Sequence, residues 1–153
     1  MTHYIPGDAT PPLGEGHKLI CHGCNDIGAW GAGFVLALSA RWPEPEAAYR
    51  SWPDCDRHLG AIQVVPVGND ISVVNMIAQL GVTWSAAGAP LRYSALATCL
   101  RKVAGYASAT GETIHMPRIS CRWQTVEAII DKELAGVEVY VYDLPKAEEL
   151  RAA

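Results

Sequence analysis

The segment from residue 18 to residue 42 constrains the fold more than any other part of this chain. Lys18 to Cys24 is almost continuously apolar, which is typical of an interior strand covered on both faces. A loop with glycines at positions 28, 31 and 33 follows and leads directly into a helix. The helical spacing is set by Phe34, Leu38 and Trp42. A strand that enters a helix through such a loop predicts an α/β sheet with helices packed against it.

The same loop predicts an anion site. Glycines let the backbone approach a ligand closely, and a helix N-terminus offers unpaired N–H groups and the positive end of the helix dipole. The loop lacks the Lys-Ser/Thr pair of a nucleoside-triphosphate P-loop, and its glycine spacing differs from the dinucleotide fingerprint. The segment alone therefore indicates an anion or a nucleotide, without saying which.

Strands and helices alternate along the rest of the chain. Further strands are expected at 3–5, 61–65, 71–77, 113–117 and 137–142, and further helices at 90–103 and 126–134. Pro43 and Pro45 are expected to end the first helix, with irregular chain from 51 to 59. The alternation predicts one domain over residues 1–145, a three-layer α/β/α sandwich with a mixed, mostly parallel sheet, and a polar tail at 146–153.

Ligands of such sheets bind at the carboxyl ends of the strands. This rule brings three loops to one place, at residues 25–33, 79–88 and 118–123. The candidate site is therefore expected at that edge of the sheet.

Composition narrows the partners. The net charge is −4 and no run of Lys or Arg is present, which argues against a nucleic-acid-binding surface. No basic-then-apolar signal segment and no apolar run near the roughly 20 residues of a membrane span is found. Five cysteines, an odd number without regular spacing, suit a reducing compartment, so the expected location is the cytoplasm.

Cys21 and Cys24 form a C-x-x-C pattern that deserves comparison with a metal site. His17, His22 and His58 are near in sequence, but no second ligand pair follows at matching spacing. The two cysteines also have unlike parity in a strand, so their side chains should point to opposite faces of the sheet. Structural cysteines and no metal are the expectation.

Four short stretches, in this order along the chain, resemble the macrodomain family of ADP-ribose-binding α/β/α modules. They are Gly7-Asp8; His22-x-Cys24-Asn25 leading to Trp30-Gly31-x-Gly33; Met116-Pro117-Arg118-Ile119; and Val141-Tyr142-Asp143. The similarity runs from Tyr4 to Leu144. Within the family, the chain is most similar to the branch of small stand-alone macrodomains related to the human terminal ADP-ribose protein glycohydrolase and the yeast ADP-ribose-1''-phosphate phosphatase.

The resemblance implies an ADP-ribose site with named contacts. Asp8, with Ala9 beside it, would accept a hydrogen bond from the adenine amine, and Tyr142 would flank the ring; a turn aspartate and a core-edge tyrosine are the alternatives. Asn25 would bind the distal ribose or act only structurally, and Trp30 would be a lid or wall there. The first diphosphate loop would be Gly31, Ala32, Gly33 and Phe34, and the second Ser120, Cys121 and Arg122. No metal or cofactor is implied, since backbone amides and a helix dipole can neutralise a diphosphate.

Two departures from the family concern catalysis. The human glycohydrolase has a nucleophilic lysine where this chain has Gln79, which we place in the binding site, and an amide cannot form a Schiff base. The second phosphate loop is shorter than in that enzyme and carries no carboxylate. The lysine-adduct mechanism is therefore excluded.

Asp26 is the acid–base candidate that remains. Asn25 and Asp26, directly or through a positioned water, would release ADP-ribose from a carboxylate ester; the alternative is that Asp26 caps a turn. His22 and His115 are expected as hydrogen-bonded core residues, and Cys121 is a weaker candidate nucleophile because no paired histidine is evident.

Two functions stay open at this point. The first is hydrolysis of mono-ADP-ribose from acidic protein side chains, or of ADP-ribose-1''-phosphate, and the Asn25-Asp26 pair favours it. The second is a non-catalytic reader or sponge for ADP-ribose or a related signalling nucleotide, which the missing lysine and aspartate favour. Either way the expected partner is ADP-ribose or a mono-ADP-ribosylated protein.

Overall fold

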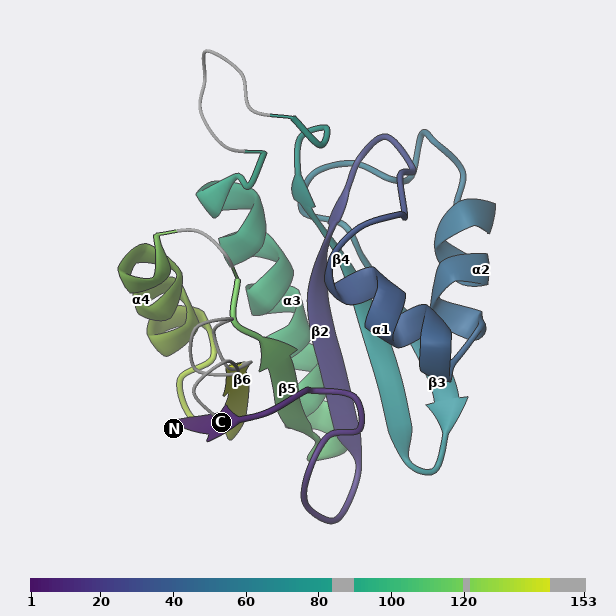
Figure 1. Ribbon diagram of the computed structural model, residues 1–153. Helices are drawn as coiled ribbons and strands as arrows, with labels where there is room; N and C mark the ends of the chain where they lie inside the picture. Colours follow the sequence, from purple (N-terminus) through teal and green to yellow (C-terminus); the bar gives the residue numbers. More distant parts are fainter. Residues whose placement is uncertain (84–89, 120–121, 144–153) are drawn as a thin grey trace, which may run out of the picture.

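The computed structural model describes residues 1–83, 90–119 and 122–143, and it has a six-stranded sheet at its centre (Figure 1). The strands are β1 (Thr2–Pro6), β2 (Lys18–Asn25), β3 (Ile62–Gly68), β4 (Ile71–Gln79), β5 (Thr113–Pro117) and β6 (Val139–Asp143). Their order is β1-β6-β5-β2-β4-β3, and every neighbouring pair is parallel except β3 and β4. The predicted mixed, mostly parallel sheet is confirmed.

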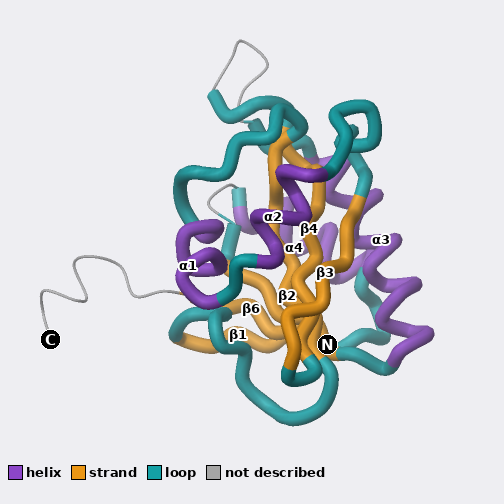
Figure 2. Tube along the Cα trace, turned by 90° about the vertical axis from the view of Figure 1, so that its right-hand side faces the viewer, coloured by secondary structure: helices purple, strands orange, loops and turns teal. Residues whose placement is uncertain are grey.

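In the described ranges, four helices cover the two faces of this sheet (Figure 2). They are α1 (Phe34–Arg41), α2 (Glu44–Ser51), α3 (Tyr93–Thr110) and α4 (Trp123–Glu133). Leu38 of α1 and Tyr49 of α2 belong to one buried cluster, and side chains such as Leu100 of α3 and Ile130 of α4 belong to another. The sheet separates the two clusters, which is the predicted three-layer arrangement.

The two cysteines of the C-x-x-C pattern lie on opposite faces of β2. Cys21 packs into the cluster under α3 and α4, and Cys24 packs into the cluster under α1 and α2. Burial raises the pKa of both thiols. Both side chains are therefore uncharged parts of the core, as the parity of the strand predicts.

The prediction of a single helix before irregular chain was wrong between residues 43 and 51. The first helix does end at Arg41, but α2 begins at Glu44 with Pro45 in its first turn. A proline is tolerated there because the first N–H groups of a helix have no partner within it. Pro45 therefore belongs to the start of the second helix.

The helix predicted from residue 90 begins later, at Tyr93. The Pro90 carbonyl instead accepts a hydrogen bond from Leu80 N–H at 2.9 Å, and Leu91 pairs with Gln79 as an isolated bridge. These contacts pair the chain at residues 90 and 91 with the last residues of β4 and the residue after it. They bring residues 90 and 91 to the edge where β4 ends.

A two-residue hairpin joins β3 to its antiparallel neighbour β4. Asn69 and Asp70 turn the chain with φ values of 53° and 60°, as in a two-residue hairpin of the type that matches strand twist. Because β2, β4, β5 and β6 are parallel to one another, their carboxyl ends lie at the same edge of the sheet. In the described part of the chain, no helix is long and apolar enough to cross a membrane. The predicted tail at 146–153 lies outside the described residues.

Candidate functional site

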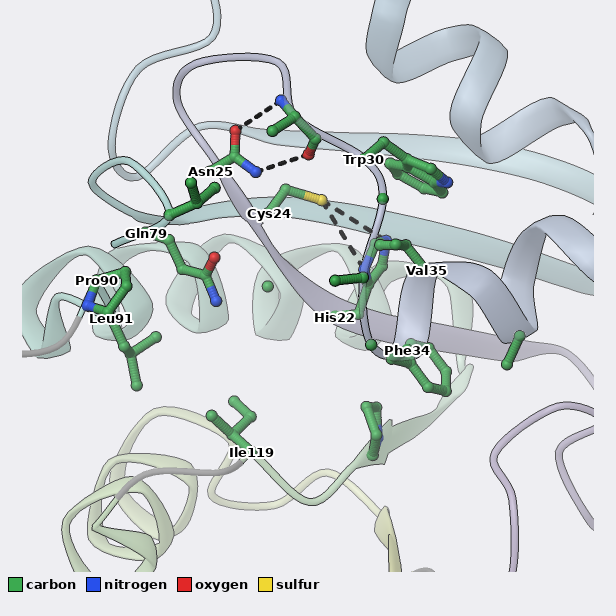
Figure 3. A pocket seen from close by; sticks show the side chains of 18 of the residues that line it. His22, Cys24, Asn25, Trp30, Phe34, Val35, Gln79, Pro90, Leu91 and Ile119 are labelled. Carbon is green, nitrogen blue, oxygen red and sulfur yellow. Dashed lines mark hydrogen bonds between the residues drawn. The ribbon is translucent and has the colours of Figure 1, made fainter. Parts of the chain in front are cut away.

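A cavity of about 880 Å³ opens at the carboxyl edge of the sheet. Its described lining comes from residue 8 after β1, from 22–25 and 29–35 around the end of β2, from Gln79 and 90–91 beside β4, and from 117–119 after β5. Figure 3 shows these side chains around one space. The three loops predicted to meet do meet here, although residues 84–89 of the second lie outside the described residues.

The glycine loop forms one wall of this cavity. Gly31, Ala32 and Gly33 line it and are exposed, with Phe34 opening α1 directly after them. Gly33 has φ 77° and ψ −142°, which side-chain-bearing residues rarely adopt. A Cβ atom added at residue 31 or 33 would meet nothing within 4 Å. No side chain therefore crowds the backbone of this loop at the start of α1, where the first N–H groups of a helix lack a partner in the preceding turn.

Asn25 lies at the end of β2, and its side-chain amide forms hydrogen bonds with the backbone of this loop. Its Oδ1 accepts hydrogen bonds from Ala29 N–H at 2.9 Å and Ile27 N–H at 3.2 Å, and its Nδ2 donates to the Ala29 carbonyl at 2.7 Å (Figure 3). An amide nitrogen carries two protons, and among the described residues the second has no acceptor. Asn25 thus organises the loop and keeps one N–H donor at the cavity.

Tyr49 holds the same asparagine from behind. Its hydroxyl is fully buried and lies 2.6 Å from the Asn25 backbone carbonyl oxygen and 2.9 Å from Asn25 Oδ1, so its single proton is shared between these two acceptors. Burial raises the pKa of Tyr49 to about 12, so it stays a neutral donor. Sequence reasoning missed this residue because it missed α2.

Arg57 supports the turn after Asn25, and sequence reasoning missed it as well. Its side chain is 7% exposed, donates from Nε to the Asp26 carbonyl at 3.2 Å, and lies over the Tyr49 ring at 5.5 Å. A Cβ atom on Gly28 would come within 2.9 Å of the guanidinium, which explains the glycine there. In the sequence, Gly28 itself is the signal for this contact, and in the structure this glycine has φ 83°.

Asp26 does not line the cavity in the described structure. Its Oδ1 accepts a hydrogen bond from Gly81 N–H at 2.8 Å, and its own N–H donates to the Gln79 carbonyl at 3.1 Å. The carboxylate therefore ties the loop after β2 to the loop after β4. Its observed contacts are those of a residue that positions two loops.

Trp30 and His22 form the wall opposite the open side of the loop. Trp30 is 7% exposed, lines the cavity, and donates from Nε1 to Ser39 Oγ at 2.8 Å. The His22 ring meets it edge-on with centroids 5.5 Å apart. Trp30 is thus a fixed part of the cavity lining, and its role at the distal ribose stays a prediction.

His22 is held in one protonation state by a buried network. Its Nε2 lies 2.6 Å from Asn75 Oδ1, and the Asn75 amide donates to the Gln63 side chain and the Pro45 carbonyl. Both Asn75 protons are committed, so His22 Nε2 is the donor of the first bond. Burial lowers the pKa of His22 to about 4, which keeps it neutral near pH 7. His22 is a hydrogen-bonded core residue, as predicted, and it also lines the cavity.

Gln79 lies at the end of β4 with its side-chain amide extending into the cavity (Figure 3). A Cβ atom on Gly23 would lie 3.9 Å from its Nε2, an ordinary van der Waals contact, so the amide lies beside the backbone of β2. No described residue makes a hydrogen bond with this amide. Among the described residues, Gln79 therefore brings two free N–H protons and a free carbonyl oxygen to the cavity.

The residues predicted to contact the base are not all together. Asp8 lines the cavity, and its Oδ1 accepts bonds from the N–H and hydroxyl of Thr10, each at 2.9 Å. Ala9 is buried and lies outside the lining. Tyr142 is also buried, and its hydroxyl contacts His115 Nδ1 at 2.8 Å. The structure thus brings Asp8 to the cavity and keeps the other two residues in the core.

The second phosphate loop is described only in part. Ser120 and Cys121 lie outside the described residues. Arg122 is exposed at the start of α4 and is not among the described residues that line the cavity. Arg118 follows β5 directly and is the positively charged residue of the described lining in this part of the chain. Among the described residues, no His, Cys, Asp and Glu side chains gather in a group that could hold a metal ion.

Comparison with known proteins identifies close structural relatives. A macrodomain protein from Streptomyces coelicolor is 45% identical, with 94% of this chain and 99% of that chain covered and a TM-score of 0.84. A protein of unknown function from Bacteroides thetaiotaomicron is 47% identical, with 94% and 98% covered and a TM-score of 0.90. The macrodomain of Thermus aquaticus DarG shares the fold at 21% identity and a TM-score of 0.72, covering 93% and 97%. No protein-family profile and no curated protein matches the chain.

Proposed function

Because the chain belongs to the macrodomain family, we propose that it binds ADP-ribose in the cavity at the carboxyl edge of the sheet. The open glycine loop at the start of α1 is the observation that carries this proposal. A diphosphate there meets unpaired N–H groups and the positive end of a helix dipole. The cavity volume of about 880 Å³ also falls within the range of roughly 300–1,000 Å³ typical of small-molecule sites.

The two ends of the cavity suit the two ends of this ligand. On one side of the glycine loop lie the free N–H of Asn25 and the free amide of Gln79, which match sugar hydroxyls. On the other side lies Asp8, whose second carboxylate oxygen can accept a hydrogen bond from the adenine amine. One structure with a similar fold, Thermosipho africanus DarTG, contains ADP-ribose, although it is only 13% identical.

Isothermal titration calorimetry with ADP-ribose tests the binding proposal. We expect saturable binding of one molecule per chain, and weaker binding of ADP, which lacks the distal ribose. Absence of heat with ADP-ribose at millimolar concentration, with the protein shown to be folded, would reject the proposal.

Hydrolysis of ester-linked mono-ADP-ribose is the second candidate, and the free Gln79 amide favours it. A carboxylate is already a good leaving group, so a positioned water that attacks the anomeric carbon is sufficient chemistry. The water oxygen bonds to that carbon, the carbon–ester oxygen bond breaks, the carboxylate leaves with the electron pair, and the added water gives up one proton to bulk solvent. Gln79 can orient the water or the ester carbonyl without transferring a proton.

In this scheme Asp26 acts as a positioning residue. Its carboxylate accepts from Gly81 N–H and lies outside the described lining, so its role is to hold the two loops together. Asp26→Asn keeps an oxygen acceptor for that N–H but removes the charge. We expect Asp26→Asn to keep most of the release of ADP-ribose from a glutamate-linked substrate, and Asp26→Ala to weaken ADP-ribose binding.

A general base at Asp26 gives a different result. Asp26→Asn would then lose turnover by about 100-fold or more while binding ADP-ribose as the wild type does. Wild-type protein that binds ADP-ribose but releases none from the substrate would leave the reader as the function of the chain.

A further inference from the structure

The base end of the cavity has no aromatic platform among its described residues. Its aromatic lining residues, His22, Trp30 and Phe34, all come from the β2–α1 segment. Tyr142, the residue expected to flank an adenine, is 2% exposed, and its hydroxyl accepts a hydrogen bond from Leu13 N–H at 2.8 Å. A purine bound beside Asp8 needs another surface for its face.

Arg118 lies at this end and is held in one place by three contacts. Its backbone N–H donates to the Tyr142 carbonyl at 3.0 Å, and its side chain donates from Nη1 to Asp143 Oδ2 at 2.9 Å. Its Cζ atom lies 5.2 Å from the centroid of the Trp123 ring. The side chain remains 44% exposed and lines the cavity.

Trp123 is itself fixed from the far side. Its Nε1 donates to the Tyr4 hydroxyl at 3.3 Å, and the Tyr4 ring meets it edge-on with centroids 6.1 Å apart. The Tyr4 hydroxyl in turn donates to Glu127 on α4. The arginine is thus backed by an indole at the start of α4 that Tyr4 of β1 holds in position.

We propose that the Arg118 guanidinium, backed by Trp123, is the platform on which the nucleobase of the bound nucleotide stacks. This inference rests on the proposed function, because it places the adenine of ADP-ribose at the Asp8 end. A guanidinium is planar and weakly hydrated, so it stacks on π-systems on either face. The Asp143 contact restricts its rotation before the ligand arrives, which lowers the entropy lost on binding.

The platform and Asp8 divide the work of recognition. Stacking on a guanidinium strengthens the binding of any base, because every base has a π-face. The Asp8 carboxylate accepts hydrogen bonds only, so it favours a base with an amino group. Arg118 therefore sets affinity, and Asp8 sets the choice of base.

Titration of ADP-ribose into Arg118→Ala and Arg118→Lys tests the platform. Lysine keeps the positive charge but has no plane, so both variants should bind about tenfold more weakly than the wild type. Both substitutions should weaken, by the same factor, the binding of an ADP-ribose analogue that has hypoxanthine in place of adenine. Thermal unfolding of each variant should stay close to that of the wild type, because the Arg118–Asp143 pair is about half exposed.

Arg41 provides the matched control. Its Cζ lies 5.4 Å from the Trp42 ring, nearly the same geometry, but at the end of α1 away from the cavity. Arg41→Ala should leave ADP-ribose affinity unchanged.

Three results would overturn the inference. Wild-type affinity in Arg118→Lys would show that only the charge matters, and wild-type affinity in Arg118→Ala would show that Arg118 does not contact the ligand. In both cases the proposed function stands, since the cavity still binds ADP-ribose. Failure of the wild-type protein to bind would instead overturn the proposed function and this inference together.

Discussion

Gly31→Ala should weaken ADP-ribose binding without changing the stability of the fold. A Cβ atom at residue 31 meets no protein atom within 4 Å, and the backbone there lies outside the left-handed region, so an alanine fits the free protein. The added methyl group instead occupies the space in front of the glycine loop that a diphosphate would take. Loss of one hydrogen bond to a charged group costs about 1.5–3 kcal/mol, which corresponds to a loss of affinity of about 10- to 100-fold.

Two further glycines make this experiment specific. Gly33 has φ 77°, so Gly33→Ala should destabilise the fold by about 1–3 kcal/mol as well as weaken binding. Gly105 lies inside α3, away from the cavity, and a Cβ atom there also meets nothing within 4 Å. Gly105→Ala should raise stability by about 0.5–1 kcal/mol through helix propensity and leave binding unchanged.

Calorimetry gives the affinities, and urea unfolding gives the stabilities. Wild-type affinity in Gly31→Ala would refute the reasoning, because it would mean that the ligand's phosphates do not approach this loop. A loss of stability in Gly31→Ala equal to that in Gly33→Ala would contradict the conclusion that an alanine fits at residue 31 without strain.

Two other predictions concern the support of the site and its response to acid. Tyr49→Phe removes a buried hydroxyl that donates to Asn25, so urea unfolding should show a loss of about 1–3 kcal/mol and calorimetry a weaker ADP-ribose complex; unchanged values in both would contradict the positioning role. Burial lowers the pKa of His22 and of His115 to about 4, so the unfolded chain takes up protons first as the pH falls below about 6.5. The free energy of unfolding should therefore fall between about pH 6.5 and 4, and a flat or rising profile there would contradict it.

The sequence predicts the sheet and the edge that holds the site because both follow from local patterns. The apolar run of β2, the strands β3 and β4, and the glycine loop each depend on neighbouring residues, and each is found as predicted. The rule that parallel strands end together then brings Asn25, Gln79 and Arg118 to one cavity.

The residues that hold the site could not be predicted in the same way. Tyr49 and Arg57 act on Asn25 and Gly28 from α2 and the chain after it, so their contacts depend on packing between elements. The start of α2 was missed because of Pro45. A proline can either end a helix or stand in the first turn of one, and the residue type alone does not distinguish the two.

The partners of Asp26 and Tyr142 were also beyond the reach of local pattern. Resemblance to the family implies a ligand contact for Tyr142, and the position of Asp26 beside Asn25 makes it the acid–base candidate. The Asp26 carboxylate meets Gly81 from another loop, and the Tyr142 hydroxyl meets His115 on the neighbouring strand. Which way each side chain turns is decided by these non-local partners, so their ligand contacts stay a proposal for binding experiments.

Backbone amide NMR shifts during titration with ADP-ribose test the central claim most directly. The account predicts that the largest shifts fall on the N–H groups of residues 31–35, with further shifts at Gln79 and Arg118. Saturating shifts confined to other parts of the surface, or no shifts at all, would contradict the assignment of this cavity as the nucleotide site.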